Sequence, residues 1–151
     1  MRRSLVLFSL VTASIAGGCG GPATKPPSRF MTTFSPEDAI KRSYVQGEGK
    51  KQPIVSNTGG LAGSGGLGIT HRSISAELVL SETEASQFLS KVKTEISDQL
   101  RKYGARATGE GAGNDQYSLE YSEGAIAGLV EIWGVRGAGD NYRLIIIIAE
   151  R

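Results

Sequence analysis

The chain has 151 residues, of which 17 are Lys or Arg and 15 are Asp or Glu, a length that suits a single domain. The formal net charge of +2 comes from Arg2 and Arg3, because the rest of the chain carries 15 basic and 15 acidic residues. A neutral domain lacks the concentrated basic face that nucleic-acid binding requires, so we expect no nucleic-acid partner.

The N-terminal segment has the organisation of a secretory signal peptide. A basic start is followed by the apolar run Leu5–Ile15 and then by the small residues 16–18, directly before Cys19. An apolar run of eleven residues fits a signal peptide and is too short for a membrane span, which takes about 20 residues of helix. We therefore predict a signal peptide over residues 1–18.

The residues Ala16-Gly17-Gly18-Cys19 resemble the lipobox of bacterial lipoproteins, in which small residues precede an invariant cysteine. One position departs from that pattern, because Ala16 stands where Leu is usual. The resemblance implies that Cys19 receives a diacylglyceryl group, that the peptide is cut just before it, and that the new amine is acylated. The alternative is an ordinary signal peptide that contains a cysteine. The chain has no second cysteine for a disulfide bond, which favours lipidation.

The resemblance also implies a location. Lipid on Cys19 would hold the exported chain at a membrane. Gly20 is not the Asp that retains such proteins at the inner membrane of enteric bacteria. We therefore expect the periplasmic side of the outer membrane, where the organism has one.

Residues 19–34 are rich in Pro and Gly and predict a tether with a reach of roughly 20 Å. Residues 35–73 predict a short helix from Pro36 to Tyr44, which Ser35 caps, and then a glycine-rich loop. That loop contains a literal G-x-G-x-x-G over residues 63–68. A loop precedes this motif and a strand follows it, whereas dinucleotide binding needs a strand before and a helix after, so we expect no cofactor there.

Residues 74–151 carry the periodic patterns. They predict a strand at 74–80, a helix from Glu82 to Tyr103 behind the capping box of Ser81 and Glu84, and a short strand at 105–108. Three further strands are predicted at 116–122, 125–136 and 141–150, joined by hairpin turns. The fold class is therefore α+β: an antiparallel β-sheet in β-α-β-β-β-β order, with one long amphipathic helix packed on one face.

Pairing Ser122 with Ala125 and Arg136 with Asn141 divides the strand residues between the two faces of the sheet. The face assigned to the helix carries Tyr117, Leu119, Tyr121, Ile126, Val130, Ile132, Ile145 and Ile147. The other face carries the apolar side chains of Leu129, Trp133, Val135, Tyr142, Leu144, Ile146 and Ile148, beside Ser118, Glu120, Ser122 and Glu131. We predict an interaction face around Trp133, Tyr142, Leu144, Ile146 and Leu129. Its cover would be residues 30–68, an envelope protein partner or a second copy of the chain.

No pattern in the sequence predicts catalysis or metal binding. His71 is the single histidine and has no partner at catalytic spacing, and Glu120 and Glu131 fit two solvated carboxylates better than an acid pair. We therefore expect a non-enzymatic envelope lipoprotein with no catalytic residue, metal or cofactor. The alternative is a periplasmic carrier of a small ligand or lipid, with a pocket between the sheet and the glycine-rich loop. A hydrolase that uses His71 is not expected.

Overall fold

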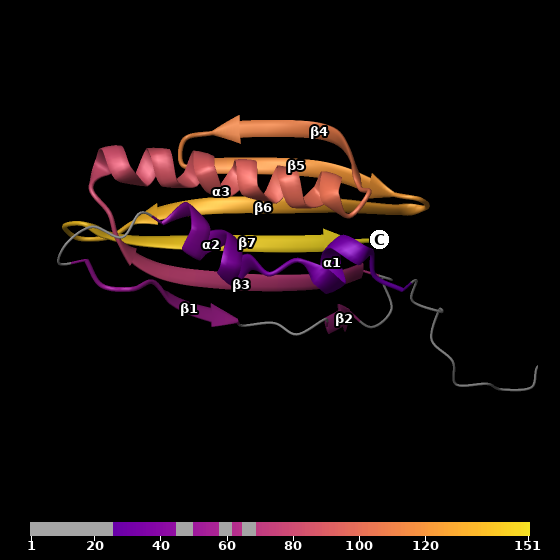
Figure 1. Cartoon of the computed structure of the whole chain (residues 1–151), viewed down its shortest axis with the longest axis horizontal. Helices are drawn as coiled ribbons and strands as arrows, with labels where there is room; N and C mark the ends of the chain where they lie inside the picture. Colours follow the sequence, from indigo (N-terminus) through magenta and orange to yellow (C-terminus); the bar gives the residue numbers. More distant parts are fainter. Residues whose placement is uncertain (1–25, 45–49, 58–61, 65–68) are drawn as a thin grey trace, which may run out of the picture.

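The computed structural model describes residues 26–44, 50–57, 62–64 and 69–151, in which helices cover one face of an antiparallel sheet (Figure 1). The predicted signal peptide and Cys19 lie outside the described residues. In chain order the elements are α1 (Arg29–Thr33), α2 (Pro36–Ser43), β1 (Ile54–Asn57), β2 (Ala62–Ser64), β3 (Ile69–Val79), α3 (Glu82–Lys102), β4 (Arg106–Gly113), β5 (Gln116–Glu123), β6 (Ile126–Arg136) and β7 (Asn141–Glu150).

The strands form one sheet in the order β1-β3-β7-β6-β5-β4, and the short β2 pairs with β3 alongside β1. All of these pairs are antiparallel. The helix α3 carries the chain from β3 to β4 at the far edge, and tight turns then return it strand by strand to β7. The α+β class and the predicted order from β3 to β7 are confirmed.

Both ends of α3 are fixed by the residues that predicted them. The Ser81 hydroxyl accepts a hydrogen bond from the backbone of Glu84, whose carboxylate accepts one from the backbone of Ser81. At the other end Gly104 has a φ of 80°, which glycine adopts without strain. The N–H of Ala105 then reaches the carbonyl of Leu100 at 2.9 Å and closes the last turn.

One side of α3 is apolar and packs over β4, β5 and β6. The spacing of three and four residues places its apolar side chains on a single stripe, and burial of each contributes roughly 1.5–3 kcal/mol. The buried residues are Ala85, Phe88, Leu89, Val92, Ile96 and Leu100.

The predicted tether is wrong at its C-terminal end, because residues 29–33 form the helix α1. Phe30, Met31 and Phe34 are all buried, and the rings of Phe30 and Phe34 stack with centroids 4.9 Å apart. Phe30 also meets Tyr121 of β5 edge-on at 5.3 Å. These three apolar side chains join the core, so the domain begins at Ser28 rather than after residue 34.

The helix α2 is confirmed at the predicted place. Its first turn is capped by the hydroxyl of Ser35, which accepts from the N–H of Asp38, and Pro36 is its first residue. Ala39 and Ile40 are fully buried and hold the helix against the core.

Parts of the predicted loops are strands. β1 and β2 lie where the sequence predicts a glycine-rich loop, β3 begins at residue 69 rather than 74, and β4 continues to residue 113 rather than 108. Apart from Ile54, Val55 and Ile69, these segments consist of small and polar residues, in which no apolar alternation is visible. They join the sheet through backbone pairing to β3 and β5, which leaves no apolar signature in the sequence.

The pairing of β6 with β7 differs from the predicted pairing by one residue, and this changes the register of β7. Arg136 pairs with Tyr142 rather than Asn141, and the N–H of Gly137 donates to the carbonyl of Asn141 at 2.8 Å. A shift of one residue moves every side chain of a strand to the opposite face. The prediction that Ile145 and Ile147 face the helix, and that Tyr142 does not, is therefore wrong.

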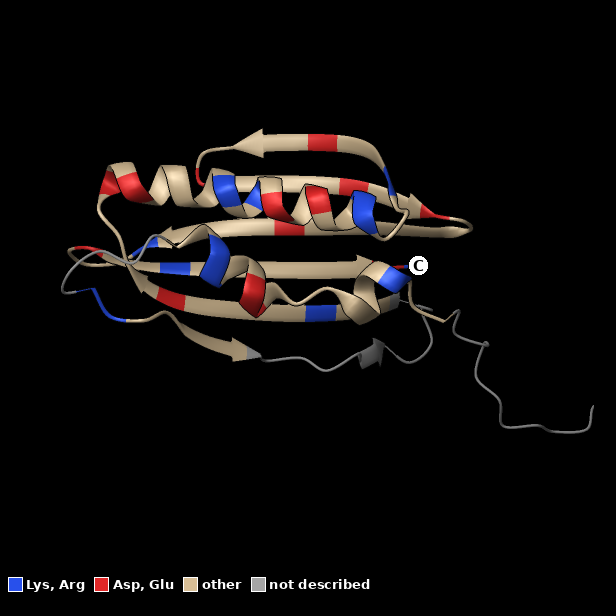
Figure 2. Cartoon of the chain, in the orientation of Figure 1, with Lys and Arg blue, Asp and Glu red and all other residues tan. Residues whose placement is uncertain are grey.

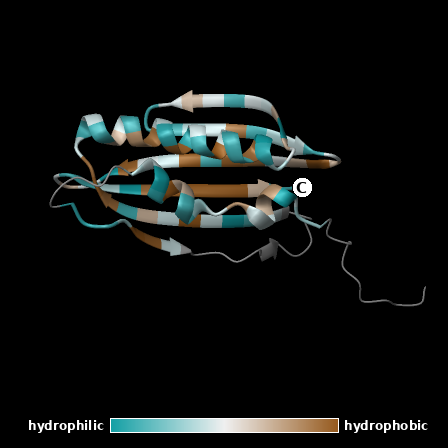
Figure 3. Ribbon diagram, viewed as in Figure 1, coloured by the Kyte–Doolittle hydropathy of each residue, from teal (hydrophilic) through white to brown (hydrophobic). Residues whose placement is uncertain are grey.

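The pairing of β5 with β6 is also shifted, but by two residues, so the faces predicted for these strands are right. Glu123 pairs with Ile126, and Tyr121 lies opposite Gly128. The core lies between the sheet and the three helices. It takes alternate residues of β7, the most apolar strand in the hydropathy colouring (Figure 3), together with Leu119, Tyr121, Val130 and Ile132.

Candidate functional site

The face of the sheet opposite the helices is the candidate site. The three helices lie on one side (Figure 1), and no helix or strand of the described chain covers the other. The register places Ile145, Ile147 and Leu129 on this open face, where they are half-buried, and pairs Ile145 with Trp133. We call this side of β1, β3, β7, β6 and β5 the open face.

Large apolar side chains that remain exposed gather on the open face. Ile54, Val79, Trp133 and Val135 are 66, 40, 38 and 48% exposed. Two of them, Ile54 and Val135, lie in one row that crosses four strands. Glu77 of β3 and Arg143 of β7 stand between them in that row. These side chains lie towards the end of the sheet where β7 begins.

Three residues of the predicted interaction face lie elsewhere. Tyr142, Leu144 and Ile146 are buried beneath the helices at 3, 0 and 0% exposure, because the one-residue shift in pairing reverses the faces of β7. Trp133 and Leu129 remain on the open face. The notion of one apolar face with all five residues is thus corrected.

Exposed residues that sequence reasoning missed belong to β1 and the end of β3. Ile54 lies in a segment with no apolar alternation. Val79 is the last residue but one of the predicted strand and lies on the face not assigned to its core. Only the alternation along the strand could have shown that Val79 is exposed, because it places Val79 on the other face of the sheet from Leu78 and Leu80.

The helix side has a different surface. Charged residues of both signs alternate along α3 and α2 (Figure 2), and several are paired across elements. Arg42 contacts Glu95 at 2.6 Å and Lys93 contacts Glu110 of β4 at 3.0 Å. A surface with paired charges of both signs is typical of a solvated face. The helix side is therefore a weaker candidate for a binding site than the open face.

A buried carboxylate fixes the start of the domain at the other end of the sheet. Glu150 is 4% exposed and accepts hydrogen bonds from the backbone N–H of Ser28 at 2.9 Å, from the Ser28 hydroxyl and from the Tyr121 hydroxyl. Burial, together with the neighbouring Glu150 carboxylate, raises the pKa of Tyr121 well above its ordinary value. This cluster binds α1 to the last residues of β7, and we call it the Glu150 clamp.

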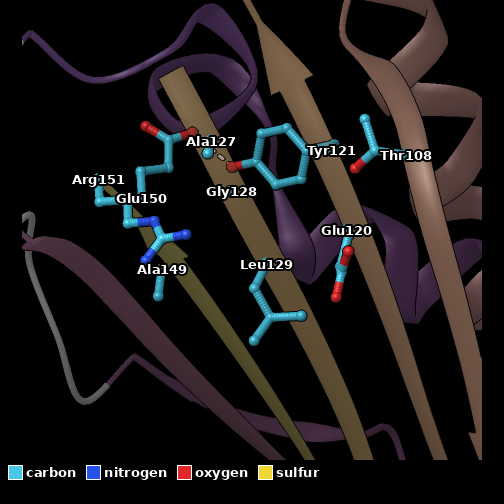
Figure 4. A pocket seen from close by; sticks show the side chains of 9 residues that line it. All are labelled: Thr108, Glu120, Tyr121, Ala127, Gly128, Leu129, Ala149, Glu150 and Arg151. Atoms are coloured by element: carbon cyan, nitrogen blue, oxygen red, sulfur yellow. Dashed lines mark hydrogen bonds between the residues drawn. The ribbon is translucent and has the colours of Figure 1, made fainter. Parts of the chain in front are cut away.

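Two tyrosine rings occupy places that a β-carbon would fill. The ring of Tyr121 crosses β6 at Gly128 (Figure 4), where its Cζ lies 2.2 Å from the ideal Cβ position. The Tyr142 hydroxyl lies 1.9 Å from the ideal Cβ position of Gly134. That hydroxyl is buried without a hydrogen-bond partner in the described chain, and burial raises the pKa of Tyr142 to about 12.

Two hollows, each of about 390 Å³, lie at opposite ends of the sheet and open to solvent. The first is the one in Figure 4 and lies beside Glu120, Leu129 and Ala149 at the end with the Glu150 clamp. The second lies beside Glu77, Val135 and Arg143. Each is a depression in a flat surface, so its geometry suits part of a larger partner better than an enclosed small molecule.

The residues considered for catalysis are spread over the open face. His71 is exposed and pairs in register with Ala149, and within the described chain no serine or acid hydrogen-bonds to it. Glu120 pairs with Leu129 and Glu131 with Ser118, which makes the two acids diagonal neighbours on β5 and β6. Among the described residues no group of three or more His, Cys, Asp and Glu side chains is placed to hold a metal ion.

Within the same residues, none of the helices has both the length and the apolar character needed to cross a bilayer. In comparisons with known proteins, no family model, curated sequence or solved structure matched this chain. The features that indicate a function are therefore those of the chain itself: its lipobox-like segment and the apolar residues on the open face.

Proposed function

We propose that the chain is an exported envelope lipoprotein, anchored through Cys19, whose domain is a non-enzymatic module that binds a protein partner on the open face. The observation that carries the binding role is the position of Ile54, Val79, Trp133 and Val135. Four large apolar side chains exposed on one flat face are the usual mark of a contact surface. The support for the anchor is the sequence of residues 1–19.

The place where the tether enters the domain also supports this proposal. The domain begins at Ser28, which is hydrogen-bonded to Glu150 at the end of β7. Trp133 pairs with Ile145, five residues back along β7, and Val135 pairs with Arg143, seven residues back. At about 3.4 Å per residue, these side chains lie about 17 and 24 Å from the point where the tether enters. The exposed apolar residues thus lie away from the point where the tether enters the domain, where a protein partner can reach them.

One experiment in bacterial cells tests both parts of the proposal with the full chain. Cys19→Ser should abolish labelling by an alkyne fatty acid and release the protein from the membrane fraction, whereas Ser14→Ala should leave both unchanged. In the same cells, a photo-crosslinking amino acid at position 133 should give discrete protein adducts, and one at position 83, on the exposed start of α3, should not.

Each of the two measurements can refute its own part of the proposal, the lipid anchor or the contact surface. A Cys19→Ser protein that is still processed, labelled and membrane-bound would show that the lipobox reading is wrong. Absence of adducts at position 133, with the protein folded and anchored, would show that the open face is not a contact surface.

A further inference from the structure

Two acidic residues beside the apolar part of the open face have no ion-pair partner. Glu120 and Glu131 form no ion pair with any described residue, and Glu120 is exposed. In register, Glu131 stands opposite Ser118 and Glu120 opposite Leu129, so the two carboxylates are diagonal neighbours. Diagonal neighbours in an antiparallel pair have β-carbons about 7–8 Å apart, close enough to act on one partner together.

Glu77 of β3, on the other side of the open face, differs from Glu120 and Glu131 because it forms an ion pair. Its carboxylate contacts Arg143 of the neighbouring strand at 3.0 Å. The charge on that side of the face is therefore neutralised within the chain. The side formed by β5 and β6 keeps two carboxylates that form no ion pair with any described residue.

Between these two sides runs an apolar strip. Ile145 and Ile147 of β7 and Trp133 and Leu129 of β6 form it, with Glu131 standing between Leu129 and Trp133 on β6, and Val135 extends it at one end. From the row of Val135 to the row of Leu129 the strip spans six residues, or about 20 Å. That length corresponds to about 14 residues of α-helix at 1.5 Å per residue.

The inner face of the same sheet already carries a helix in a matching arrangement. The apolar stripe of α3 packs on the strands, and Lys93 at the margin of that stripe contacts Glu110 of β4 at 3.0 Å. The inner face of this sheet therefore already packs against a helix whose apolar stripe has a lysine at its margin, paired with a carboxylate of a strand.

We propose that the open face docks an amphipathic helix of a partner protein, with an apolar stripe on Trp133, Ile145 and Ile147 and with Lys or Arg residues over Glu120 and Glu131. This inference rests on the proposed function and names the chemistry of its partner. A membrane of anionic lipids would be repelled by the two carboxylates. A second copy of the chain would add two more of the same carboxylates to the contact.

Trp133 makes the test direct, because it is the only tryptophan of the chain. The probes are two synthetic 14-residue helical peptides with the same leucine stripe, one with lysines and one with glutamates on its polar face. The lysine peptide should shift Trp133 emission to shorter wavelength in a saturable titration that weakens with added salt, and the glutamate peptide should not.

Glu120→Gln/Glu131→Gln should weaken binding of the lysine peptide about 3- to 10-fold and reduce its salt dependence, because each exposed ion pair contributes modestly. The matched control Glu37→Gln/Glu82→Gln removes two charges from the helix side and should leave the affinity unchanged. Trp133→Ala, followed with a labelled lysine peptide, should weaken binding at least 10-fold.

Four results would overturn the inference: equal binding of both peptides, unchanged affinity in the Glu120→Gln/Glu131→Gln protein, a Trp133 shift with anionic vesicles alone, or self-association through the open face. These outcomes are separable from failure of the proposed function. If adducts form at position 133 in cells and the Gln variants leave them unchanged, the partner chemistry is wrong while the binding role stands.

Discussion

At the scale of single residues, two glycines of β6 decide how the core closes. Gly128 and Gly134 lie on the helix side, each beneath a tyrosine of a neighbouring strand. An aromatic ring laid over a strand glycine buries apolar area that the glycine cannot supply itself. The same close approach means that these positions accept no β-carbon without movement of Tyr121 or Tyr142.

Gly134→Ala should therefore destabilise the domain by about 1–3 kcal/mol, the usual cost of overpacking a core. The matched control is Gly113→Ala on β4, where the nearest atom to an added Cβ is 3.9 Å away. Urea unfolding followed by Trp133 fluorescence measures both. A Gly134→Ala protein within 0.5 kcal/mol of wild type, on the order of the effect of a surface substitution, would contradict this account.

At the scale of elements, the start of α3 combines two kinds of contact at Glu84. The carboxylate accepts from the Lys50 ammonium and from the backbone of Ser81, and these bonds lower the pKa of Glu84 to about 2. Lys50 lies in the segment before β1, so this ion pair links α3 to the edge of the sheet.

A lowered folded pKa stabilises the domain above the unfolded pKa, and the contribution is lost as the pH falls from about 4.5 to about 2. Lys50→Gln should raise the pKa of Glu84 and remove that part of the acid sensitivity. Titration of the Glu84 carboxyl carbon by NMR measures the change. Lys51→Gln is the control, since Lys51 is exposed, and an equal pKa in the Lys50→Gln protein would refute the role of the ion pair.

Long periodic elements were predictable and registers were not. The capping box and the apolar stripe located α3 within one residue, and Ser35-Pro36 located the start of α2. The strands β1, β2 and most of β4 carry no apolar alternation, because backbone pairing to a neighbour is enough to place them. One residue in the turn after Arg136 decided which half of β7 is core, and turn length is not encoded in the alternating pattern. The open face was therefore predicted for β6 and mispredicted for β7.

At the scale of the whole molecule, the exposed apolar residues and the start of the domain lie at opposite ends of the sheet. Ser28 is held at Glu150, whereas Val135 and Ile54 share the row seven residues earlier along β7. If the proposed lipid on Cys19 anchors the chain, eight residues lie between the anchor and Ser28, and the nine steps along the chain span no more than about 32 Å. The end with the Glu150 clamp should then face the membrane.

This orientation predicts unequal energy transfer from tryptophan to a dansyl-labelled lipid in vesicles that carry the lipidated protein. Trp133 is the distal donor. The variant Trp133→Phe/Ala127→Trp moves the donor to the row of Arg151, beside the clamp. Transfer should be more efficient from position 127 than from position 133, and the opposite order would overturn the orientation.

The Glu150 clamp has a mechanical consequence. Because Ser28 is hydrogen-bonded to the last glutamate of β7 and continues covalently into α1, tension on the chain before Ser28 reaches α1 and, through those hydrogen bonds, an interior strand rather than an edge. β7 pairs along its length with β3 on one side and β6 on the other, so a pull along the strand loads both ladders in shear at once. Many hydrogen bonds would have to break together before β7 moved, whereas a pull on an edge strand opens them one after another. The hydrogen bonds of the Glu150 clamp should therefore break before either ladder, so that such a load detaches α1 and leaves the sheet and its open face intact.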